Sequence, residues 1–276
     1  MPLLDIIILS LIQGITEFLP VSSSGHLVLA GHALNEGKDP SWNNHMMLDV
    51  AVHIGTLFSV LIYFRHDIRD MFRGIKSAFT GQIDNHGTRM ILHVTIGSIP
   101  VIIAGLALHL LKPDWLLAIE IIGWTTLIFG IILWVADRAP ERKTDLGQMT
   151  LKDAFLIGLA QSLALIPGVS RSGITMTAGR FLGYSRTECA HYALLLGIIA
   201  ISGAGALGSL SIIESHDLAL TLDIGLAILL SFIAGWISIA LMMRMLQKTS
   251  FAPFAIYRII LGLALLIYVY HDALLS

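Results

Sequence analysis

The chain has 276 residues, of which 55% are hydrophobic and 13% are charged, and its formal net charge is −2. Soluble domains carry about 25% charged residues, so this composition excludes an ordinary soluble domain and indicates several membrane-spanning helices. The lack of a basic surplus argues against a nucleic-acid partner, because phosphate binding needs concentrated lysine and arginine. We expect the single cysteine, Cys189, to be a small buried side chain without a disulfide partner.

Apolar stretches follow one another along the chain. Two of them, 3–34 and 154–185, are each interrupted by a proline- and serine-rich segment, which predicts two short helices joined by a turn. Hydrocarbon tolerates such broken backbone only where it is buried in protein or lines a wet cavity. The other stretches contain about 20 apolar residues each, enough to cross the hydrocarbon. They predict full spans at 46–64, 90–110, 115–136, 189–210, 220–243 and 253–270.

Lysine and arginine gather in the loops that follow the first, third and fifth predicted spans, which predicts that these loops are cytoplasmic. The first broken stretch then enters from the outer face and the second from the cytoplasmic face. Three spans follow each re-entrant hairpin, and an odd number of spans inverts the second copy. The sequence therefore predicts an all-α polytopic membrane protein with one domain, 1–276, made of two inverted-topology repeats, about 1–145 and 146–276, whose hairpin tips meet within the bilayer.

Polar side chains lie on one face of the first predicted half-helix. Ser10, Gln13 and Glu17 are spaced three and four residues apart, so they share that face. A glutamate inside an apolar segment is costly, and it usually marks a functional site. The alternative is that Glu17 ends the helix at a wet interface before Pro20.

The first interrupting segment, Phe18 to His26, contains three consecutive serines and a glycine. Small residues before a helix let backbone N–H groups converge into an anion-binding nest, for which Ser22, Ser24 and Gly25 are candidates. The alternative for these serines is an N-cap cluster. Ser23 and His26 are three residues apart, within reach of each other as a nucleophile and a base.

The second interrupting segment, Ile166 to Gly173, repeats the pattern Ser-x-Ser-Gly but has Arg171 at the position of Ser23. A guanidinium buried in the membrane needs an anion, and its planar fork suits phosphate or carboxylate oxygens. The alternative is a salt bridge between Arg171 and Glu17, which is compatible with phosphate binding if it opens for substrate. The candidate binding residues around Arg171 are Gly168, Ser170, Ser172 and Gly173.

This set of residues leaves two classes of function open. A glutamate, serine hydroxyls, a histidine and an arginine suit phosphoryl transfer from a lipid phosphate or diphosphate, where positioning and charge neutralisation dominate catalysis. Inverted repeats with broken helices are also transporter architecture, so the alternative is a carrier or flippase for an anionic lipid. A nucleophile beside a base favours the enzyme, and a purely structural scaffold leaves Glu17 and Arg171 unexplained.

The two motifs, Gln13-x-x-x-Glu17 running on to His26 and Pro167 to Gly173, resemble the signatures of the bacterial undecaprenyl-diphosphate phosphatases of the bacitracin-resistance type. The stretches Arg89 to Pro100 and Ser250 to Arg258 are also similar to that family, so the resemblance covers essentially the whole chain. It implies hydrolysis of undecaprenyl diphosphate to undecaprenyl phosphate and inorganic phosphate. This reaction recycles the lipid carrier of peptidoglycan synthesis at the outer side of the bacterial inner membrane.

The resemblance also implies the site residues. Glu17, Ser23, His26 and Arg171 match the family's catalytic positions, and we prefer Ser23 as the nucleophile with His26 as the general acid/base, although His26 as nucleophile stays open. A divalent cation, Mg²⁺ or Ca²⁺, is implied as well. Magnesium often uses one carboxylate plus substrate phosphates, so Glu17 is the candidate ligand.

The chain departs from the family pattern in a few places. Gln13 stands where many members have glutamate, which leaves one carboxylate at the site, and His53 stands where glutamine is common. We expect His53 to be a polar residue that lines the same cavity and contributes to substrate binding. The segment Leu194 to Ala200 lacks an expected proline. The small residues Gly203 to Gly208 suit either intramolecular helix contacts or a homodimer face.

Overall fold

The computed structural model describes residues 2–34, 42–79, 85–111, 118–214 and 218–275, with the side chains of 204–214 and 218–221 among those left undescribed. Its elements are helices throughout the described ranges, apart from one isolated bridge between Lys143 and Tyr184. The predicted all-α class is therefore confirmed. The first half contains α1 (Leu3–Thr16), α2 (Ser23–Ala33), α3 (Trp42–Tyr63), α4 (Arg65–Phe79), α5 (His86–Leu111) and α6 (Ile119–Asp137).

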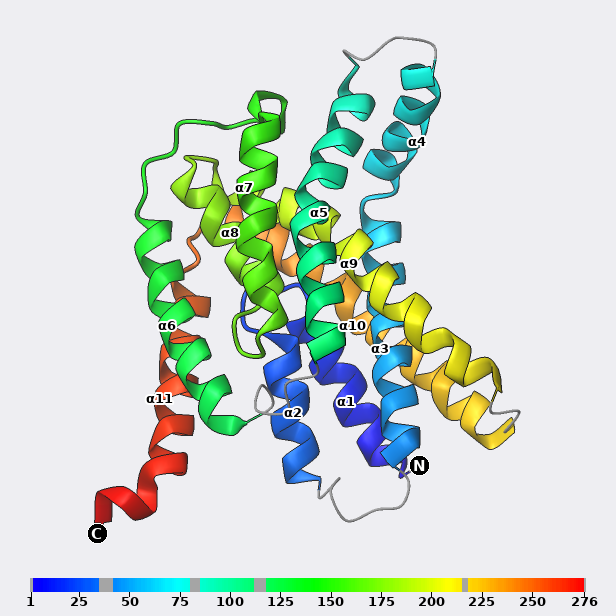
Figure 1. Cartoon of the computed structure of the whole chain (residues 1–276), viewed down its shortest axis with the longest axis vertical. Helices are drawn as coiled ribbons and strands as arrows, with labels where there is room; N and C mark the ends of the chain where they lie inside the picture. The colour runs from blue at the N-terminus through cyan, green and yellow to red at the C-terminus, as the bar shows by residue number, and fades with distance from the viewer. Residues whose placement is uncertain (1, 35–41, 80–84, 112–117, 215–217, 276) are drawn as a thin grey trace.

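The second half contains α7 (Leu151–Gln161), the short 3₁₀ helix η4 (Ser162–Leu165), α8 (Arg171–Phe181), α9 (Arg186–Glu214), α10 (Leu218–Leu246) and α11 (Ala252–Leu275), preceded by the 3₁₀ turn η3 (Leu146–Gln148). Both broken stretches fold as predicted, into two short helices around a turn. In Figure 1, α1 and α2 occupy one half of the molecule and α7 and α8 the other, and the two turns lie between them.

The number of spans differs from the prediction. Four helices in the described residues are long and apolar enough to cross a membrane, within α5, α6, α10 and α11. The predicted span 46–64 corresponds to α3, whose described apolar part is short. Helix α4 follows it at an angle of 80°. The two helices together count as at most a fifth, broken span. The predicted span 189–210 lies in α9, where side chains from residue 204 onward, including most of Gly203 to Gly208, fall outside the described residues.

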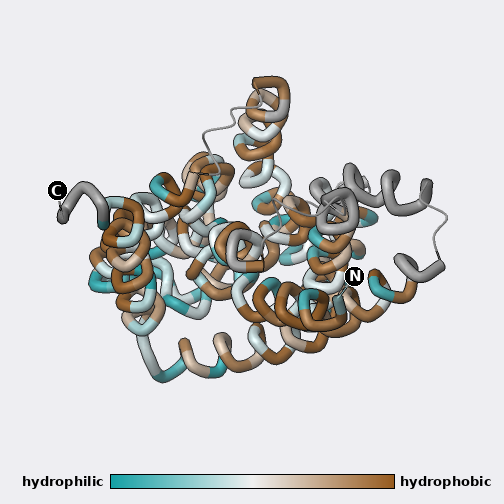
Figure 2. The backbone as a smooth tube through the Cα atoms, turned by 90° about the horizontal axis from the view of Figure 1, so that it is seen from below, coloured by the Kyte–Doolittle hydropathy of each residue, from teal (hydrophilic) through white to brown (hydrophobic). Residues whose placement is uncertain are grey.

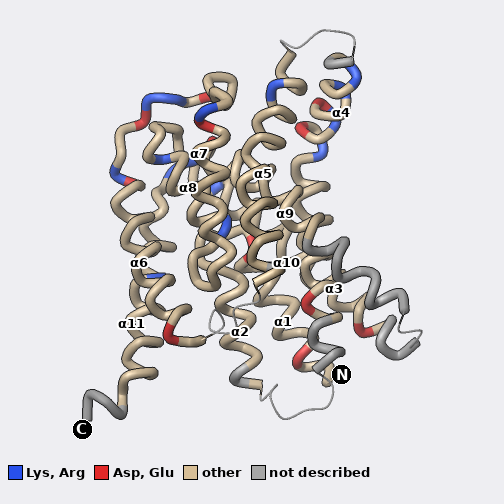
Figure 3. The backbone as a smooth tube through the Cα atoms, in the orientation of Figure 1, with Lys and Arg blue, Asp and Glu red and all other residues tan. Residues whose placement is uncertain are grey.

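Charge and hydropathy are distributed as in a membrane protein. Apolar residues run along the helices at the periphery (Figure 2). Lysines and arginines gather at the end that holds α4 and the loop between α6 and α7, whereas acidic residues dominate the opposite end (Figure 3). Helix α1 begins and α11 ends at that opposite end. This asymmetry follows the rule that positive loops face the cytoplasm.

The first helices of the two hairpins, α1 and α7, pack closely on longer helices of the other half. Helix α1 lies against α10, where a Cβ at Gly14 would come within 2.6 Å of the Ala234 Cβ. Helix α7 lies against α5, where a Cβ at Gly158 would come within 2.0 Å of the Gly97 carbonyl oxygen. These reciprocal contacts are what an inverted pair of repeats would make, but the repeat relationship over 1–145 and 146–276 stays a prediction.

Candidate functional site

The two hairpin tips share one unusual backbone feature. Ser22 and Ser170 are the two non-glycine residues in the described chain with positive φ, at 75° and 72°. Each is the N-cap of the following helix, and its hydroxyl accepts a hydrogen bond from the backbone N–H of Gly25 or Gly173, respectively. A serine with positive φ is unfavourable unless its surroundings hold it. The N-cap alternative for these serines is thus correct locally, and it defines the shape of both tips.

The tips touch each other directly. The backbone N–H of Gly168 in the second tip donates to the Ser22 hydroxyl over 3.1 Å. The Ser172 hydroxyl donates to the carbonyl oxygen of Leu19 in the first tip over 2.8 Å. The prediction that the interrupted segments meet is therefore confirmed, and the polar groups of one turn satisfy those of the other.

Glu17 connects the chemistry of both tips. It is 7% exposed. Its carboxylate accepts hydrogen bonds from Gln13 Nε2 at 3.0 Å and from Ser23 Oγ at 2.5 Å, and its other oxygen lies 3.1 Å from Arg171 Nη2. The alternative of a salt bridge between Arg171 and Glu17 is therefore realised. A buried ion pair is stable only when further hydrogen bonds surround it, and Gln13 and Ser23 supply them.

Some buried polar atoms beside Glu17 have no partner. They are Arg171 Nη1 and Gln13 Oε1, and Ser10 Oγ on the same helix is also unsatisfied. An unsatisfied buried polar group costs about 1 to 3 kcal/mol, so it needs an explanation. Arg171 Nη1 is a cationic donor, which suits an anionic ligand. Gln13 Oε1 is an acceptor, which suits a proton donor or a cation.

His26 does not contact Ser23 in the way the sequence suggested. Its Nδ1 is 2.7 Å from the carbonyl oxygen of Ser22, and its Nε2 is 2.6 Å from the hydroxyl of Tyr257 on α11. The Ser23 hydroxyl is instead bonded to Glu17. The base nearest to Ser23 is therefore Glu17, whereas His26 is bound by Ser22 and Tyr257.

Sequence reasoning missed Arg258, which is 0% exposed and holds both tips together. Its Nη2 donates to the carbonyl oxygens of Gly168 and Val169, each at 2.9 Å, and its Nη1 donates to that of Pro20 at 3.3 Å. From α6, the Thr125 hydroxyl donates to the Pro167 carbonyl oxygen over 2.7 Å. A signal was available, because an arginine inside the apolar stretch 253–270 is expensive and marks a functional position.

The remaining predicted residue, His53, lies on α3. Its Nδ1 is 2.7 Å from the carbonyl oxygen of Asp49, one turn earlier. It is close enough to interact electrostatically with Glu17 and Arg171, so it borders the same site. Sequence reasoning also passed over Gln161, which precedes Ser170 by the spacing that separates Gln13 from Ser22. Gln161 is fully buried, and neither polar atom of its amide has a partner.

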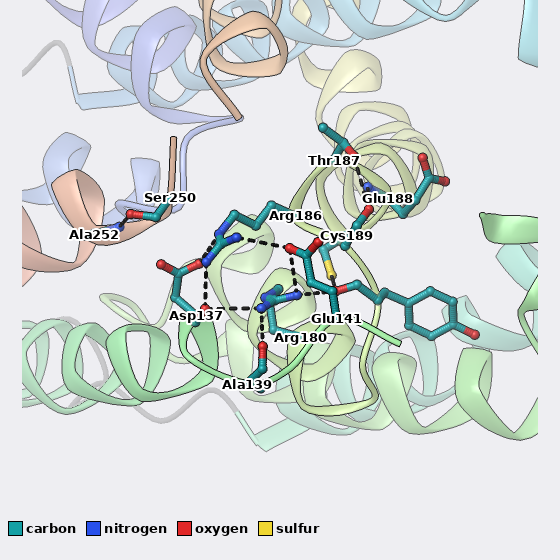
Figure 4. Close-up of polar contacts among 12 residues, drawn as sticks. Asp137, Ala139, Glu141, Arg180, Arg186, Thr187, Glu188, Cys189, Ser250 and Ala252 are labelled. Carbon is teal, nitrogen blue, oxygen red and sulfur yellow. Dashed lines mark hydrogen bonds and ion pairs between the residues drawn. The ribbon is translucent and has the colours of Figure 1, made fainter. Parts of the chain in front are cut away.

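A separate polar cluster ties the basic end of the second hairpin to α6 and α9 (Figure 4). Arg180, which is 1% exposed, donates to the carbonyl oxygens of Asp137, Ala139 and Tyr184. Arg186 pairs with Asp137 at 2.6 Å and with Glu141 at 3.0 Å. Protein groups bind both terminal nitrogens of Arg180, and Arg180 Nε alone in this cluster is buried without a partner. The cluster therefore supports the hairpin and leaves the reactive groups at the tips.

Nearby, Asp153 fastens the start of α7. Its carboxylate accepts from Lys143 Nζ at 2.7 Å and from the Tyr184 hydroxyl at 2.8 Å. Burial raises the pKa of Asp153, but the hydrogen bonds from Lys143, Tyr184 and Thr150 outweigh it and hold the pKa below its usual value. Burial and the same carboxylate raise the pKa of Tyr184.

Comparison with known proteins identifies the family of the chain. The family model of bacitracin resistance protein BacA matches residues 6–264. The chain is 45% identical to the undecaprenyl-diphosphatase of Roseobacter denitrificans, over 98% of this chain and 100% of that protein. It is 43% identical to that of Ruegeria pomeroyi, over 96% and 98%, and 42% identical to that of Hahella chejuensis, over 97% and 98%. The chain therefore belongs to the bacitracin resistance protein BacA family.

Proposed function

We propose that this membrane protein hydrolyses undecaprenyl diphosphate to undecaprenyl phosphate and inorganic phosphate. The observation that supports this most strongly is the position of Glu17, which bonds the Ser23 hydroxyl of one tip and the Arg171 guanidinium of the other. One carboxylate thus serves as the base and binds both the nucleophile and the phosphate-binding cation. The names of the relatives supply the identity of the substrate.

In the proposed reaction, Ser23 Oγ attacks the terminal phosphorus while its proton passes to Glu17 Oε2, 2.5 Å away. The new O–P bond replaces the bond between that phosphorus and the bridging oxygen, and undecaprenyl phosphate leaves with the electron pair. Water then attacks the phosphoserine and releases inorganic phosphate. Ser23 regains a proton from Glu17 as the ester bond breaks, while His26, as general acid/base, takes the proton lost by the water and passes it to the departing phosphate.

Arg171 stabilises the charge that develops on the phosphoryl oxygens. Its Nη2 is held by Glu17, and its Nη1 has no protein partner and is buried, so it is preorganised to donate to the substrate. The N-terminus of α2 and that of α8 begin at the tips and add partial positive charge. Ser22, Ser24, Ser170 and Ser172 shape these nests mainly through their mutual and backbone hydrogen bonds.

We also propose that a divalent cation, Mg²⁺ or Ca²⁺, binds beside the substrate. No group of three or more His, Cys, Asp or Glu side chains suited to a metal lies in the described residues. The residues that fit are Glu17 and Gln13, whose buried Oε1 has no partner and is the kind of oxygen ligand that these ions prefer. When bound, such a cation would neutralise charge on the diphosphate.

The proposed location is the bacterial inner membrane, with the site reached from the periplasmic side. Lysine and arginine gather at the end opposite to α1 and α2, and the first hairpin therefore approaches the tips from the outer face. There the enzyme would return the lipid carrier to peptidoglycan synthesis and lower the amount of undecaprenyl diphosphate available to bacitracin.

The test is phosphate release from undecaprenyl diphosphate by the purified protein in detergent, with Mg²⁺, with Ca²⁺ and with EDTA. Ser23→Ala is compared with Ser202→Ala, which removes an exposed serine hydroxyl from α9. We expect cation-dependent release by the wild type and by Ser202→Ala, and loss of about 10²-fold or more in Ser23→Ala. Phosphate trapped on Ser23 after rapid quenching would identify the nucleophile.

Two results would contradict the proposal. Absence of release by monodisperse wild-type protein would favour the carrier function, which needs the arginine and the backbone nests but no nucleophile. Phosphohistidine at His26 instead of phosphoserine would reverse the assignment of the nucleophile while leaving the reaction intact.

A further inference from the structure

The two ring nitrogens of His26 have different and fixed partners. Nδ1 lies 2.7 Å from the carbonyl oxygen of Ser22, and a carbonyl can only accept, so Nδ1 carries a proton. In the neutral ring Nε2 is then the sole acceptor. It lies 2.6 Å from the Tyr257 hydroxyl, which donates to it. The atom through which His26 could take a proton is thus occupied by Tyr257.

Tyr257 is held over the imidazole by more than this hydrogen bond. The two rings stack, with their centroids 5.7 Å apart and their planes 12° from parallel. The next residue, Arg258, is anchored to the carbonyl oxygens of both tips, so the backbone of α11 is fixed at this point. The position of the tyrosine therefore follows from the same contact that assembles the tips.

Tyr257 also borders the membrane. Its side chain is 44% exposed, beside Ile256 and Ile260, which are 50% and 63% exposed on the apolar surface of α11. A lipid that approaches His26 along this surface meets the tyrosine first. No other partner of His26 Nε2 is present in the described part of the chain.

We propose that Tyr257 is a positioning residue of the site, which orients the His26 ring and covers its Nε2 on the side that faces the bilayer. The inference rests on the proposed function for its kinetic consequence, but the geometry stands independently of it. The tyrosine hydroxyl fixes the tautomer of His26, and its ring separates the imidazole from lipid. Substrate gains access to Nε2 only when this hydrogen bond opens.

The first test measures the histidine directly. Diethyl pyrocarbonate acylates an imidazole nitrogen that has a free lone pair, and the extent of modification at each histidine is read by peptide mass spectrometry. We expect His26 in Tyr257→Phe to react several-fold faster than in the wild type, relative to the exposed His66 of the same molecules. Tyr268→Phe, the same change at a 73% exposed position of the same helix, should leave the rate unchanged. Equal rates at His26 in all three proteins would overturn the proposal.

The second test is kinetic and asks whether Tyr257 acts through His26. We expect Tyr257→Phe to lower kcat about tenfold with little change in KM. This loss is smaller than the roughly hundredfold or greater acceleration that a positioned acid–base group supplies. In a His26→Ala background the same change should cost nothing further, because the group it positions is gone. Additive losses would show that Tyr257 acts elsewhere and would overturn the proposal. If the wild type releases no phosphate, the proposed function fails, whereas the acylation experiment still decides the role of Tyr257.

Discussion

The two hairpin tips have the same capping serine and opposite chemistry. Ser22 and Ser170 adopt the same strained conformation and cap the same kind of short helix. The charged groups lie at two of the positions where the tips differ, since Ser23 and Glu17 in the first correspond to Arg171 and Leu165 in the second. The first tip therefore supplies a carboxylate and a hydroxyl, and the second supplies a cation. A shared scaffold has been specialised so that neither tip is a site without the other.

Removing the cation of the second tip should have the largest effect. We expect Arg171→Ala to lower kcat/KM for phosphate release by about 10³-fold or more, because both the substrate charge and Glu17 lose their partner. Arg171→Lys should recover only part of this loss, since an ammonium lacks the planar fork. Steady-state kinetics on monodisperse protein would check both. Activity near that of the wild type in Arg171→Ala would mean that the tips are not complementary.

Separating the tips should have the next largest effect, on stability. Arg258→Met leaves the carbonyl oxygens of Pro20, Gly168 and Val169 without their donor, so we expect a loss of about 3 kcal/mol or more. This corresponds to a thermal midpoint lower by roughly 5 to 10 °C. Arg244→Met, at an exposed position of α10, is the matched control and should leave the midpoint unchanged. A stable Arg258→Met protein would show that other contacts hold the tips together.

A third change moves Arg171 without replacing it. Gly197 on α9 lies against its guanidinium, so that a Cβ there would come within 1.8 Å of Arg171 Nη1. Arg171 is flexible enough to yield, and we expect Gly197→Ala to shift it away from Glu17. A displacement of about 1 Å can cost as much as 10²-fold in rate, so kcat should fall while the thermal midpoint changes little. Unchanged kcat would indicate that the position of the guanidinium is not critical.

Both hairpins can be compared through their packing glycines. Alanine at Gly158 places its Cβ against a backbone carbonyl at 2.0 Å, whereas alanine at Gly14 meets the Ala234 methyl group at 2.6 Å. Overpacking costs about 1 to 3 kcal/mol, and we expect Gly158→Ala to lie at the upper end and Gly14→Ala below it. Gly203→Ala, with nothing within 4 Å, serves as the control in the same thermal unfolding assay. The reverse order of the two hairpin variants would contradict the described packing.

The smallest effect concerns the basic end of the second hairpin. Asp153→Asn should lower stability at neutral pH by about 1 kcal/mol through loss of the bond to Lys143. The pKa of Asp153 is lower in the folded state than in the unfolded state, where it is about 3.9. The carboxylate therefore stabilises the fold fully above about pH 3.9, and this stabilisation is lost as the pH falls through the folded-state pKa. The difference between Asp153→Asn and the wild type should therefore persist at pH 5 to 7 and shrink below about pH 4. A constant difference across that range would rule out this contribution.

The local features of this molecule could be predicted from sequence, and the long-range ones could not. The spacing of proline, serine and glycine predicted both turns. The odd number of predicted spans after each hairpin predicted that the two turns meet. Glu17 and Arg171 were identified because charge in hydrocarbon is costly. The partner of His26 was missed, because Tyr257 lies 231 residues away and looks like an ordinary interfacial aromatic residue. The 80° bend between α3 and α4 was also missed, because hydropathy does not reveal it.

The place of Arg258 in the chain has a consequence for the order of assembly. It lies on α11, which follows both hairpins by many residues, yet it donates to the backbone of both tips. A nascent chain that has inserted everything up to α10 already carries the carboxylate, the hydroxyl and Arg171, together with the direct contacts between the tips, but it lacks the three bonds from Arg258 to their carbonyl oxygens. We therefore expect the tips to reach their full rigidity only after the last helix has packed against them.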